Sequence, residues 1–381
     1  MSNAIVGWWR RRRSRFGPDL TAAVSDSGTA TQPEQVYLHP STVQTRAADA
    51  ASRRLAWSRA GMTDATAWQE EARTRLARIT GYGRYGGPPA ILHSAELAAA
   101  NGLRQTDLLL RVRDGHDIPL RVLRLEAHGG LPLPVMICMQ DRANGMNVSW
   151  GESHGPGDAA AVANGYDFAV QAVRRGYAAV CLELPGIGMR REPAGGRTEA
   201  ENLVSALYAG RCPLAEAASE ISFAVNWLVL GQTGFTVDDN RIFLAGHGFG
   251  GGAAVLAVAL DDRLAGIIAV DCLAPVRVLL KSGPPPLEFV LPGLLHWMDM
   301  EDVSALCAPR PFLAVAGRHH PLWPVSRAVQ VVEGARPVYA ALGVSGRIAA
   351  MPAPDAGGID SGAVWREFER LQDLDTEPVA G

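Results

Sequence analysis

The spacing of apolar positions changes along the chain from helical to alternating strand and helix. Over residues 41–80, apolar and aromatic side chains recur at helical intervals, and Pro88-Pro89 end this element. Three strand-like apolar runs follow, over 107–112, 119–125 and 134–139. The third run is continuously apolar, as expected of a strand that is covered on both faces.

Beyond residue 150, predicted helices alternate with predicted strands. The expected strands cover 178–182, 241–245, 265–270, 311–316 and 346–350. The expected helices cover 158–175, 199–230, 249–260, 325–342 and 362–371. This alternation predicts an α/β fold, with a mostly parallel central sheet that is covered by helices on both faces.

Composition divides the chain into three parts. Residues 1–40 are predicted to be a poorly ordered basic tail, and residues 41–100 an N-terminal helical extension. Residues 101–375 form the predicted α/β domain, with a Pro-rich, lid-like insertion at about 277–302. Whether the helical extension forms a homodimer interface is left open.

The charge and the cysteines narrow the range of partners. A formal net charge of -3 over 381 residues provides no overall field for nucleic acid, and no run of about 18 apolar residues predicts a membrane span. Five scattered cysteines, among them Cys138 and Cys181 inside predicted strands, favour buried thiols and a reducing compartment. We therefore expect a cytoplasmic protein whose partner is a small molecule, with no nucleic acid or membrane partner.

The segment Gly246-His247-Gly248-Phe249-Gly250 carries the most information about chemistry. It follows a predicted strand and precedes a predicted helix, which is the setting of the nucleophile elbow G-x-S-x-G. Here the serine position is Gly248, so the frame of the motif is present and its nucleophile is absent.

With this segment, the chain resembles the α/β-hydrolase superfamily, in particular its acetyl-xylan-esterase and dienelactone-hydrolase-like branch. The resemblance covers about residues 50–372. It rests on DDNRIFLAGHGFGGGAAVLAVALDDRLAGIIAV around the elbow, on HWMDMEDVSALCAPRPFLAVAGRHHPLWPV towards the acidic position, and on LPGIGMRR after the fourth core strand. The resemblance implies an α/β-hydrolase fold for the domain.

The resemblance also implies a Ser, acid and His triad in that chain order. On this chain the serine position is Gly248, the acid position is His320 and the histidine position is Asp355. No histidine follows His320. The first oxyanion position, a His-Gly pair in the family, holds Gln140-Asp141, where a carboxylate would oppose an oxyanion. The backbone N–H of Phe249 remains as the second donor.

These departures from the family's triad and oxyanion residues suggest an active site with changed chemistry. His320 and Asp355 form a swapped pair that moves protons, with a leftover structural salt bridge as the alternative, and Asp141 is a further candidate base. Gly248 forms an open floor for a bulky, partly aromatic ligand. The predicted walls and contacts of this pocket are Gln140, Arg142, Phe249, Trp150, Trp297 and Trp323.

Other reactive side chains are assigned no role. Cys272 follows a predicted strand, and the family's residue there is structural. His296, Asp299 and His319 match no metal-site spacing, so we expect neither a metal nor a cofactor.

Three functional hypotheses follow. The first is a non-hydrolytic, lyase or cyclase type of enzyme that forms carbon–carbon bonds, cyclises or dehydrates a polyketide-type intermediate in bacterial natural-product biosynthesis. This hypothesis rests on association with recruited members of the superfamily. The second is an inactive hydrolase fold that binds a ligand or a protein. The third is a hydrolase that uses water activated by a displaced base such as Asp141 or Asp355.

Overall fold

The computed structural model describes residues 40–59, 61, 63–84, 86–100, 102–112, 116–126, 130–231, 233–283, 285–353 and 361–373, without the side chains of 98–100 and 361. The chain divides into two compact units, residues 1–51 and 52–381. In the first unit, helix α3 (Pro40–Asp49) has no buried residue. The expected basic tail falls outside the described residues except for Pro40. The boundaries drawn from the sequence at 40, 100 and 375 remain a prediction.

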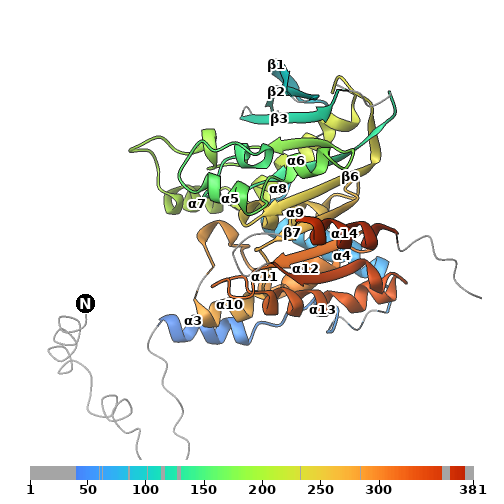
Figure 1. The fold of residues 1–381 in the computed structure, drawn as a ribbon. Helices are drawn as coiled ribbons and strands as arrows, with labels where there is room; N and C mark the ends of the chain where they lie inside the picture. Colours follow the sequence, from blue (N-terminus) through green and yellow to red (C-terminus); the bar gives the residue numbers. More distant parts are fainter. Residues whose placement is uncertain are drawn as a thin grey trace, which may run out of the picture. The chain divides into compact units, whose positions relative to one another are not determined.

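A nine-stranded sheet organises the second unit (Figure 1). Its strands are β1 (Ala90–Ala100), β2 (Leu103–Arg111), β3 (Asp117–Leu125), β4 (Leu133–Met139), β5 (Ala178–Leu182), β6 (Val237–His247), β7 (Gly266–Val270), β8 (Phe312–Ala316) and β9 (Ile348–Pro352). Their spatial order is β1-β2-β3-β5-β4-β6-β7-β8-β9. Strands β5, β4 and β6 to β9 are parallel, whereas β1, β2 and β3 pair antiparallel at one edge. The predicted α/β fold with a mostly parallel sheet is confirmed.

Helices connect the strands and cover both faces of the sheet. The helices of this unit are α4 (Ala65–Thr80), α5 (Asp158–Ala163), α6 (Phe168–Val173), α7 (Glu199–Tyr208), α8 (Pro213–Val229), α9 (Phe249–Leu260), α10 (Val276–Ser282), α11 (Leu294–Trp297), α12 (Met300–Ala305), α13 (Val325–Ala341) and α14 (Ser361–Asp373). Short 3₁₀ turns are η2 (Met146–Trp150), η3 (Gly188–Arg190), η4 (Leu287–Phe289) and η5 (Ser345–Arg347).

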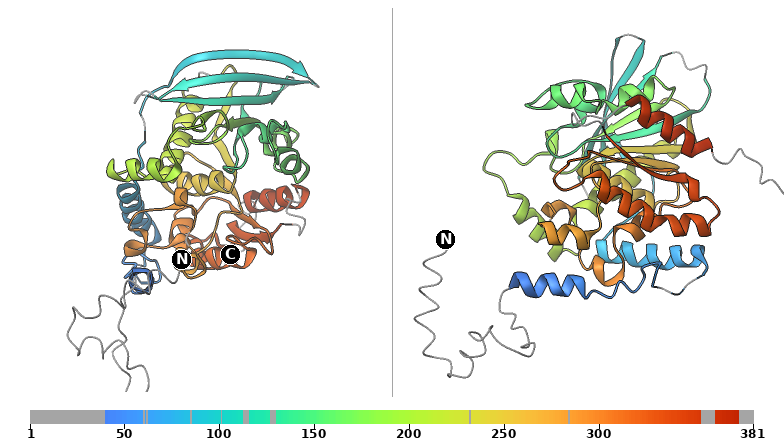
Figure 2. Two further views of the ribbon diagram at one scale, coloured as in Figure 1. Left: turned by 90° about the vertical axis from the view of Figure 1, so that its left-hand side faces the viewer. Right: turned by 60° about the horizontal axis from the view of Figure 1, so that its bottom comes forward.

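The alternation of side chains along the central strands builds two apolar layers. In β4, Val135 and Ile137 pack into one layer, and Met136 and Cys138 pack into the other. Helices α4, α8, α9, α12 and α13 supply the first layer, and α6 and α14 supply the second (Figure 2). Because β4, β5, β7 and β8 are covered on both faces, their sequences are almost entirely apolar.

Two predicted helices are each divided by a glycine. The expected helix over 158–175 is α5 and α6, separated at Gly165, whose φ is 82°. The expected helical region over 199–230 is α7 and α8, separated at Gly210, with Pro213 as the first residue of α8. The insertion at about 277–302, expected to be irregular, contains α10, α11 and α12.

The segment that we grouped with the helical extension contributes both a helix and a strand to the second unit. Helix α4 begins after Asp64, whose side chain accepts hydrogen bonds from the Thr66 and Ala67 N–H groups, and it ends at Gly81 in the left-handed conformation. Its Trp68 is fully buried. Residues 90–100 form β1 and pair with β2, so this part is not helical.

The five cysteines are unpaired and buried, as expected for Cys138 and Cys181. Burial raises the pKa of the Cys138, Cys181 and Cys272 thiols, which argues against a reactive thiolate at these positions. Within the part of the chain that the structure describes, no helix combines the length and apolar character needed to cross a membrane.

Trp68 provides a test of how firmly α4 belongs to the core. Its indole N–H donates to the Leu55 carbonyl at 2.8 Å, and its ring lies edge-on to Trp57 at 5.5 Å between centroids. We expect Trp68→Ala to lower the free energy of unfolding by about 3–5 kcal/mol, measured by urea denaturation. Leu92→Ala, at an exposed position of β1, is the control and should change it by less than about 0.5 kcal/mol. A loss of under about 1 kcal/mol for Trp68→Ala would contradict this prediction.

Candidate active site

The elbow lies between β6 and α9, at the carboxyl end of the parallel strands. Gly248 adopts φ 54° and ψ -119°, a conformation that side chains rarely tolerate, and its N–H donates to the Val270 carbonyl at 2.9 Å. The strand and the helix then pack closely. A Cβ on Gly246 would come within 2.5 Å of the Gly250 carbonyl oxygen, and one on Gly250 within 2.8 Å of Met139 Cβ. The sharp strand–turn–helix geometry of the motif is therefore present.

The carboxylate of Asp141 occupies the space beside Gly248. Its Oδ1 accepts a hydrogen bond from the Phe249 N–H at 2.8 Å. A Cβ on Gly248 would overlap this carboxylate and would lie 2.7 Å from Asp141 Cβ. The open space that we expected above Gly248 is thus filled by a side chain from the loop after β4. The carboxylate lies at the N-terminus of α9, where the helix dipole favours a negative charge.

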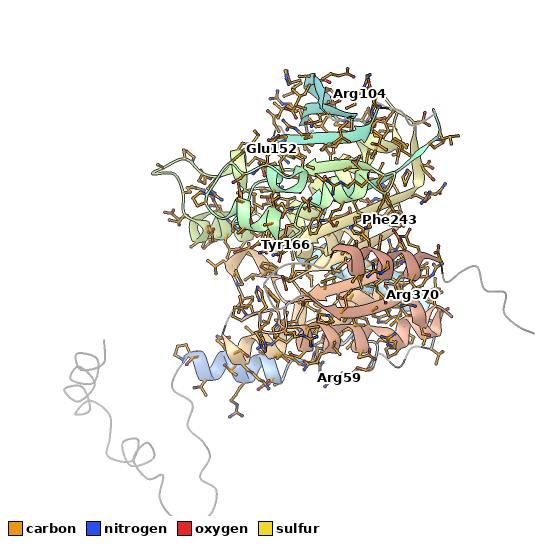
Figure 3. All side chains as sticks on the ribbon, viewed as in Figure 1. Arg59, Arg104, Glu152, Tyr166, Phe243 and Arg370 are labelled. Carbon is orange, nitrogen blue, oxygen red and sulfur yellow. The ribbon has the colours of Figure 1, made fainter. Side chains whose placement is uncertain are left out.

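His247, at the end of β6, lies near a second carboxylate, that of Asp271. Nε2 of His247 lies 4.0 Å from Asp271 Oδ2, and the imidazole is 17% exposed. Tyr166, labelled in Figure 3, packs against His247 with 4.2 Å between ring centroids, and its hydroxyl donates to Asp271 Oδ2 at 3.3 Å. Asp271 Oδ1 accepts a hydrogen bond from Gly317 N–H at 2.9 Å, which connects the ends of β7 and β8.

Burial is the dominant influence on His247 and lowers the pKa of its imidazole. The charges of Asp141 and Asp271 oppose this shift, and His320 adds to it. The neutral imidazole is therefore favoured, and its Nδ1 is buried with no hydrogen-bond partner among the described residues. The same electrostatic effects show that these four side chains share one region of the protein.

His320 presents one side of its ring to the backbone. Its Nδ1 lies 3.2 Å from the Leu322 N–H and 3.0 Å from the Trp323 N–H, and it accepts from both. In the neutral ring the proton is therefore on Nε2, which makes that nitrogen a donor. The expected partner, Asp355, lies outside the described residues, so the swapped pair remains a prediction.

The other predicted oxyanion residues hold the loop in place. Gln140 is buried, and its Nε2 donates to Ser149 Oγ at 2.9 Å and to the Tyr166 carbonyl at 2.8 Å. Arg142 pairs with Glu199 at 2.8 Å, and its guanidinium lies 5.8 Å from the centroid of the Phe249 ring. Arg142 therefore lies beside the elbow, whereas the side chain of Gln140 is turned into the protein.

The three predicted tryptophan walls are separated. Trp150 packs under the Arg121 guanidinium at 4.3 Å, and Trp297 lies against Arg75 at 3.7 Å. Trp323 packs on Phe289, which in turn contacts Phe249. Trp323 is thus connected to the elbow through aromatic ring contacts. Asp299, considered above for a metal, caps α12 and pairs with Arg277 at 2.7 Å.

We did not predict Asp271 and Tyr166 as site residues from the sequence. The signal for Asp271 was its place directly after the apolar run 266–270, since side chains at the ends of parallel strands meet at one edge. Its φ of 48° is unusual for a residue other than glycine. Tyr166 lies in the break between α5 and α6, where the sequence predicted a continuous helix.

These features define an α/β-hydrolase fold with an altered elbow, and similarity to known proteins supports the fold. No family model matches the chain. Over 175 residues, the chain is 27% identical to the protein named Putative hydrolase YtaP of Bacillus subtilis. The match covers 45% of this chain and 56% of that protein, so it spans little more than half of the relative's length.

Solved structures of esterases share this fold. A putative acetyl xylan esterase from Bacteroides fragilis superimposes with a TM-score of 0.68 at 16% identity, covering 92% of this chain and 87% of that chain. A glucuronoyl esterase from Teredinibacter turnerae gives a TM-score of 0.62 at 16% identity, covering 93% of this chain and 94% of that chain. A glucuronoyl esterase from Solibacter usitatus gives a TM-score of 0.60 at 17% identity, covering 82% of this chain and 94% of that chain. At such identities the likeness establishes the fold alone.

The comparisons correct the expected function. The solved structures bear the names of esterases and the sequence relative that of a hydrolase. The predicted lyase or cyclase, with carbon–carbon bond formation, cyclisation or dehydration, is therefore wrong. The link to natural-product biosynthesis rested on composition and association, and it has no support here. The hydrolase alternative is the better supported hypothesis.

The overlap at the elbow predicts coupled effects of two substitutions. Gly248→Ser should lower the free energy of unfolding by about 1–3 kcal/mol, because its side chain overlaps Asp141 and its φ is positive. Combining it with Asp141→Ala should recover about 1 kcal/mol in a double-mutant cycle that is measured by urea denaturation. Gly246→Ala with Asp141→Ala is the control and should be additive, since a Cβ there meets the Gly250 backbone. Additive losses for both pairs would contradict the overlap.

The lowered pKa of His247 predicts a dependence of stability on pH. The unfolded chain binds this proton near about pH 6.5 and the folded protein only at lower pH, so stability is lost as the pH falls below about 6.5. His247→Gln should therefore reduce the loss of stability between about pH 6.5 and 5, followed by denaturation at each pH. Parallel profiles for wild type and His247→Gln would refute the assignment.

Proposed function

We propose that this protein is a hydrolase in which the Asp141 carboxylate activates a water molecule for attack on an ester, in place of a serine at the elbow. The observation that carries the proposal is the overlap between the Asp141 carboxylate and the side-chain position of residue 248. Similarity to esterases and to a hydrolase supports the reaction class.

Asp141 has the properties of a general base. The Phe249 N–H holds Oδ1 of Asp141 at the start of α9, beside the elbow, so the carboxylate is in position to accept a proton. With Oδ1 held by the backbone, Oδ2 is the oxygen that takes the proton from water. The water oxygen then forms the new bond to the ester carbonyl carbon, the alkoxide leaves, and the proton returns to it from Asp141.

His320 is the proposed donor to the carbonyl oxygen. The Phe249 N–H already binds Asp141, so the negative charge on the substrate needs another donor. The backbone N–H groups of Leu322 and Trp323 hold His320 with its Nε2 as that donor.

Hydrolysis of nitrophenyl esters with acyl chains of increasing length tests this proposal. We expect turnover without an initial burst, because no acyl-enzyme forms. Asp141→Asn should lower kcat about a hundredfold or more by removing the base, and His320→Gln should lower it about a hundredfold. Asp262→Asn, at an 82% exposed side chain, is the matched control and should retain full activity.

Three outcomes would overturn the proposal. Covalent labelling by a fluorophosphonate, together with a burst of nitrophenol, would show a serine-type esterase that uses another serine. No turnover of any ester would instead favour the binding protein. Full activity of Asp141→Asn would remove Asp141 from the mechanism whatever the substrate.

A further inference from the structure

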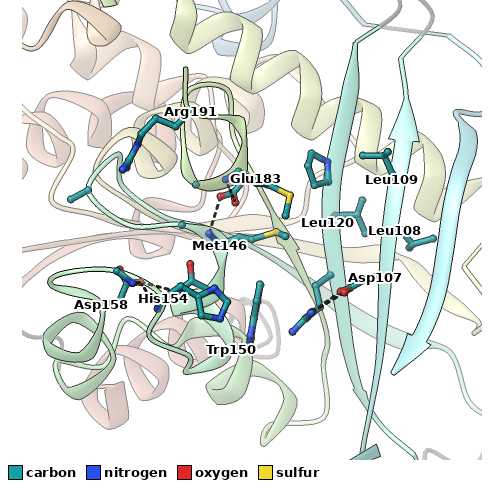
Figure 4. Close-up of a pocket in the computed structure, with 18 of the residues that line it drawn as sticks. Asp107, Leu108, Leu109, Leu120, Met146, Trp150, His154, Asp158, Glu183 and Arg191 are labelled. Atoms are coloured by element: carbon teal, nitrogen blue, oxygen red, sulfur yellow. Dashed lines mark hydrogen bonds and ion pairs between the residues drawn. The ribbon is translucent and has the colours of Figure 1, made fainter. Parts of the chain in front are cut away.

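A cavity of about 530 Å³ lies apart from the elbow, between the antiparallel edge of the sheet and two loops (Figure 4). Strands β2 and β3 form one wall. The loop that follows Asp141, including η2, and the loop after β5, including η3, form the others. Neither Asp141 nor Gly248 lines this cavity. Its volume falls in the range of small-molecule sites.

The acidic groups of the walls are already satisfied within the protein. Asp107 receives two hydrogen bonds from Arg121, at 2.6 and 2.8 Å. Glu183 accepts the N–H groups of Met146 at 2.8 Å and Met189 at 3.2 Å. These carboxylates therefore build the walls and leave little capacity for a ligand.

Asp158 is the most fully bound of these carboxylates. It accepts hydrogen bonds from the Asn144 and Asn147 side chains and from the backbone N–H groups of His154 and Gly155, at 2.8 to 2.9 Å. Burial alone would raise its pKa, but these donors hold the pKa below its ordinary value.

The interior of the cavity is apolar. Met146, Leu120 and Pro119 line it, and Trp150 forms a flat wall under the Arg121 guanidinium (Figure 4). Met189 stands at the rim with 71% of its surface exposed. A large apolar side chain that exposed, beside an apolar cavity, is typical of a ligand-binding surface.

One positive charge at the rim has no acidic partner. Arg191 lines the cavity and donates to the Arg142 carbonyl at 2.9 Å. Within the described ranges, no carboxylate forms an ion pair with Arg191, whereas Arg121 pairs with Asp107 and Arg190 with Glu220. Burial raises the pKa of the nearby Glu183, and the charges of Arg190 and Arg191 oppose this shift. A carboxylate at the rim would complete the hydrogen bonds of Arg191.

We propose that this cavity binds a flat, apolar or aromatic carboxylic acid, with its ring against Trp150 and the methionines and its carboxylate on Arg191. The site is independent of the hydrolase proposed above, since no residue of the proposed mechanism lines it.

Two probes that share the naphthalene ring, one an anion and the other neutral, test the site. Binding of 2-naphthoate and of 2-naphthalenemethanol to the full-length protein is measured by calorimetry at fixed ionic strength. We expect naphthoate to bind about tenfold more tightly, and Arg191→Gln to abolish that difference without weakening the alcohol. Arg197→Gln, at an exposed arginine that does not line the cavity, should leave both affinities unchanged.

A matched pair of substitutions tests the location. Met189→Glu should weaken naphthoate more than tenfold, because it places a charge at the apolar rim. Leu131→Glu, at a leucine that is 70% exposed and away from the cavity, should have no effect. Both positions are on the surface, so neither variant should impair folding.

Three results would overturn the proposal. Absence of naphthoate binding at millimolar concentration would show that the cavity is not a ligand site for this class. Equal effects of Met189→Glu and Leu131→Glu would place any binding elsewhere. Retention of the preference for naphthoate over the alcohol in Arg191→Gln would remove Arg191 from the site, and this result can be separated from hydrolase failure because no ester is turned over.

Discussion

The hydrogen bond from the Phe249 N–H to the Asp141 carboxylate determines how the carboxyl end of the sheet is arranged. It joins the loop after β4 to the N-terminus of α9, and the carboxylate fits there because Gly248 has no side chain. A serine at 248 and an aspartate at 141 would overlap, whereas glycine and aspartate fit together. The two departures seen in the sequence are therefore one structural exchange, since the glycine at 248 leaves the space that the Asp141 carboxylate fills.

This exchange brings charge into a region with little solvent, so each carboxylate needs donors. Asp141 has the Phe249 N–H, and Asp271 has the Gly317 N–H and the Tyr166 hydroxyl. Nδ1 of His247 is buried without a partner among the described residues, and a group of this kind typically costs about 1–3 kcal/mol.

The parts that the sequence predicts well are those whose side chains are buried on every side. The continuous apolar runs of β4, β5, β7 and β8 predict their strands to within one or two residues. Strand β1 was missed because it is an edge strand whose Ile91, Leu92 and Leu97 are partly exposed, so its pattern has no clear period. The site depends on contacts between loops far apart in sequence, such as Asp141 with Phe249. The position of Asp141 beside the family's oxyanion residues predicts that it differs from the residue expected there. Only the fold shows that its carboxylate fills the space beside Gly248.

The loop from Asp141 to Trp150 contributes to both the elbow and the cavity, so the two sites rest on the same scaffold. From the elbow side, the Phe249 N–H holds Asp141; from the cavity side, Glu183 holds the Met146 N–H. Glu183 in turn reaches Met146 because Gly188, with φ 49°, leaves room for its carboxylate. A second glycine thus makes space for a second buried carboxylate, as Gly248 does for Asp141. A ligand that displaced Met146 or Arg191 would therefore act on the loop that positions Asp141, through hydrogen bonds that already exist in the unliganded protein.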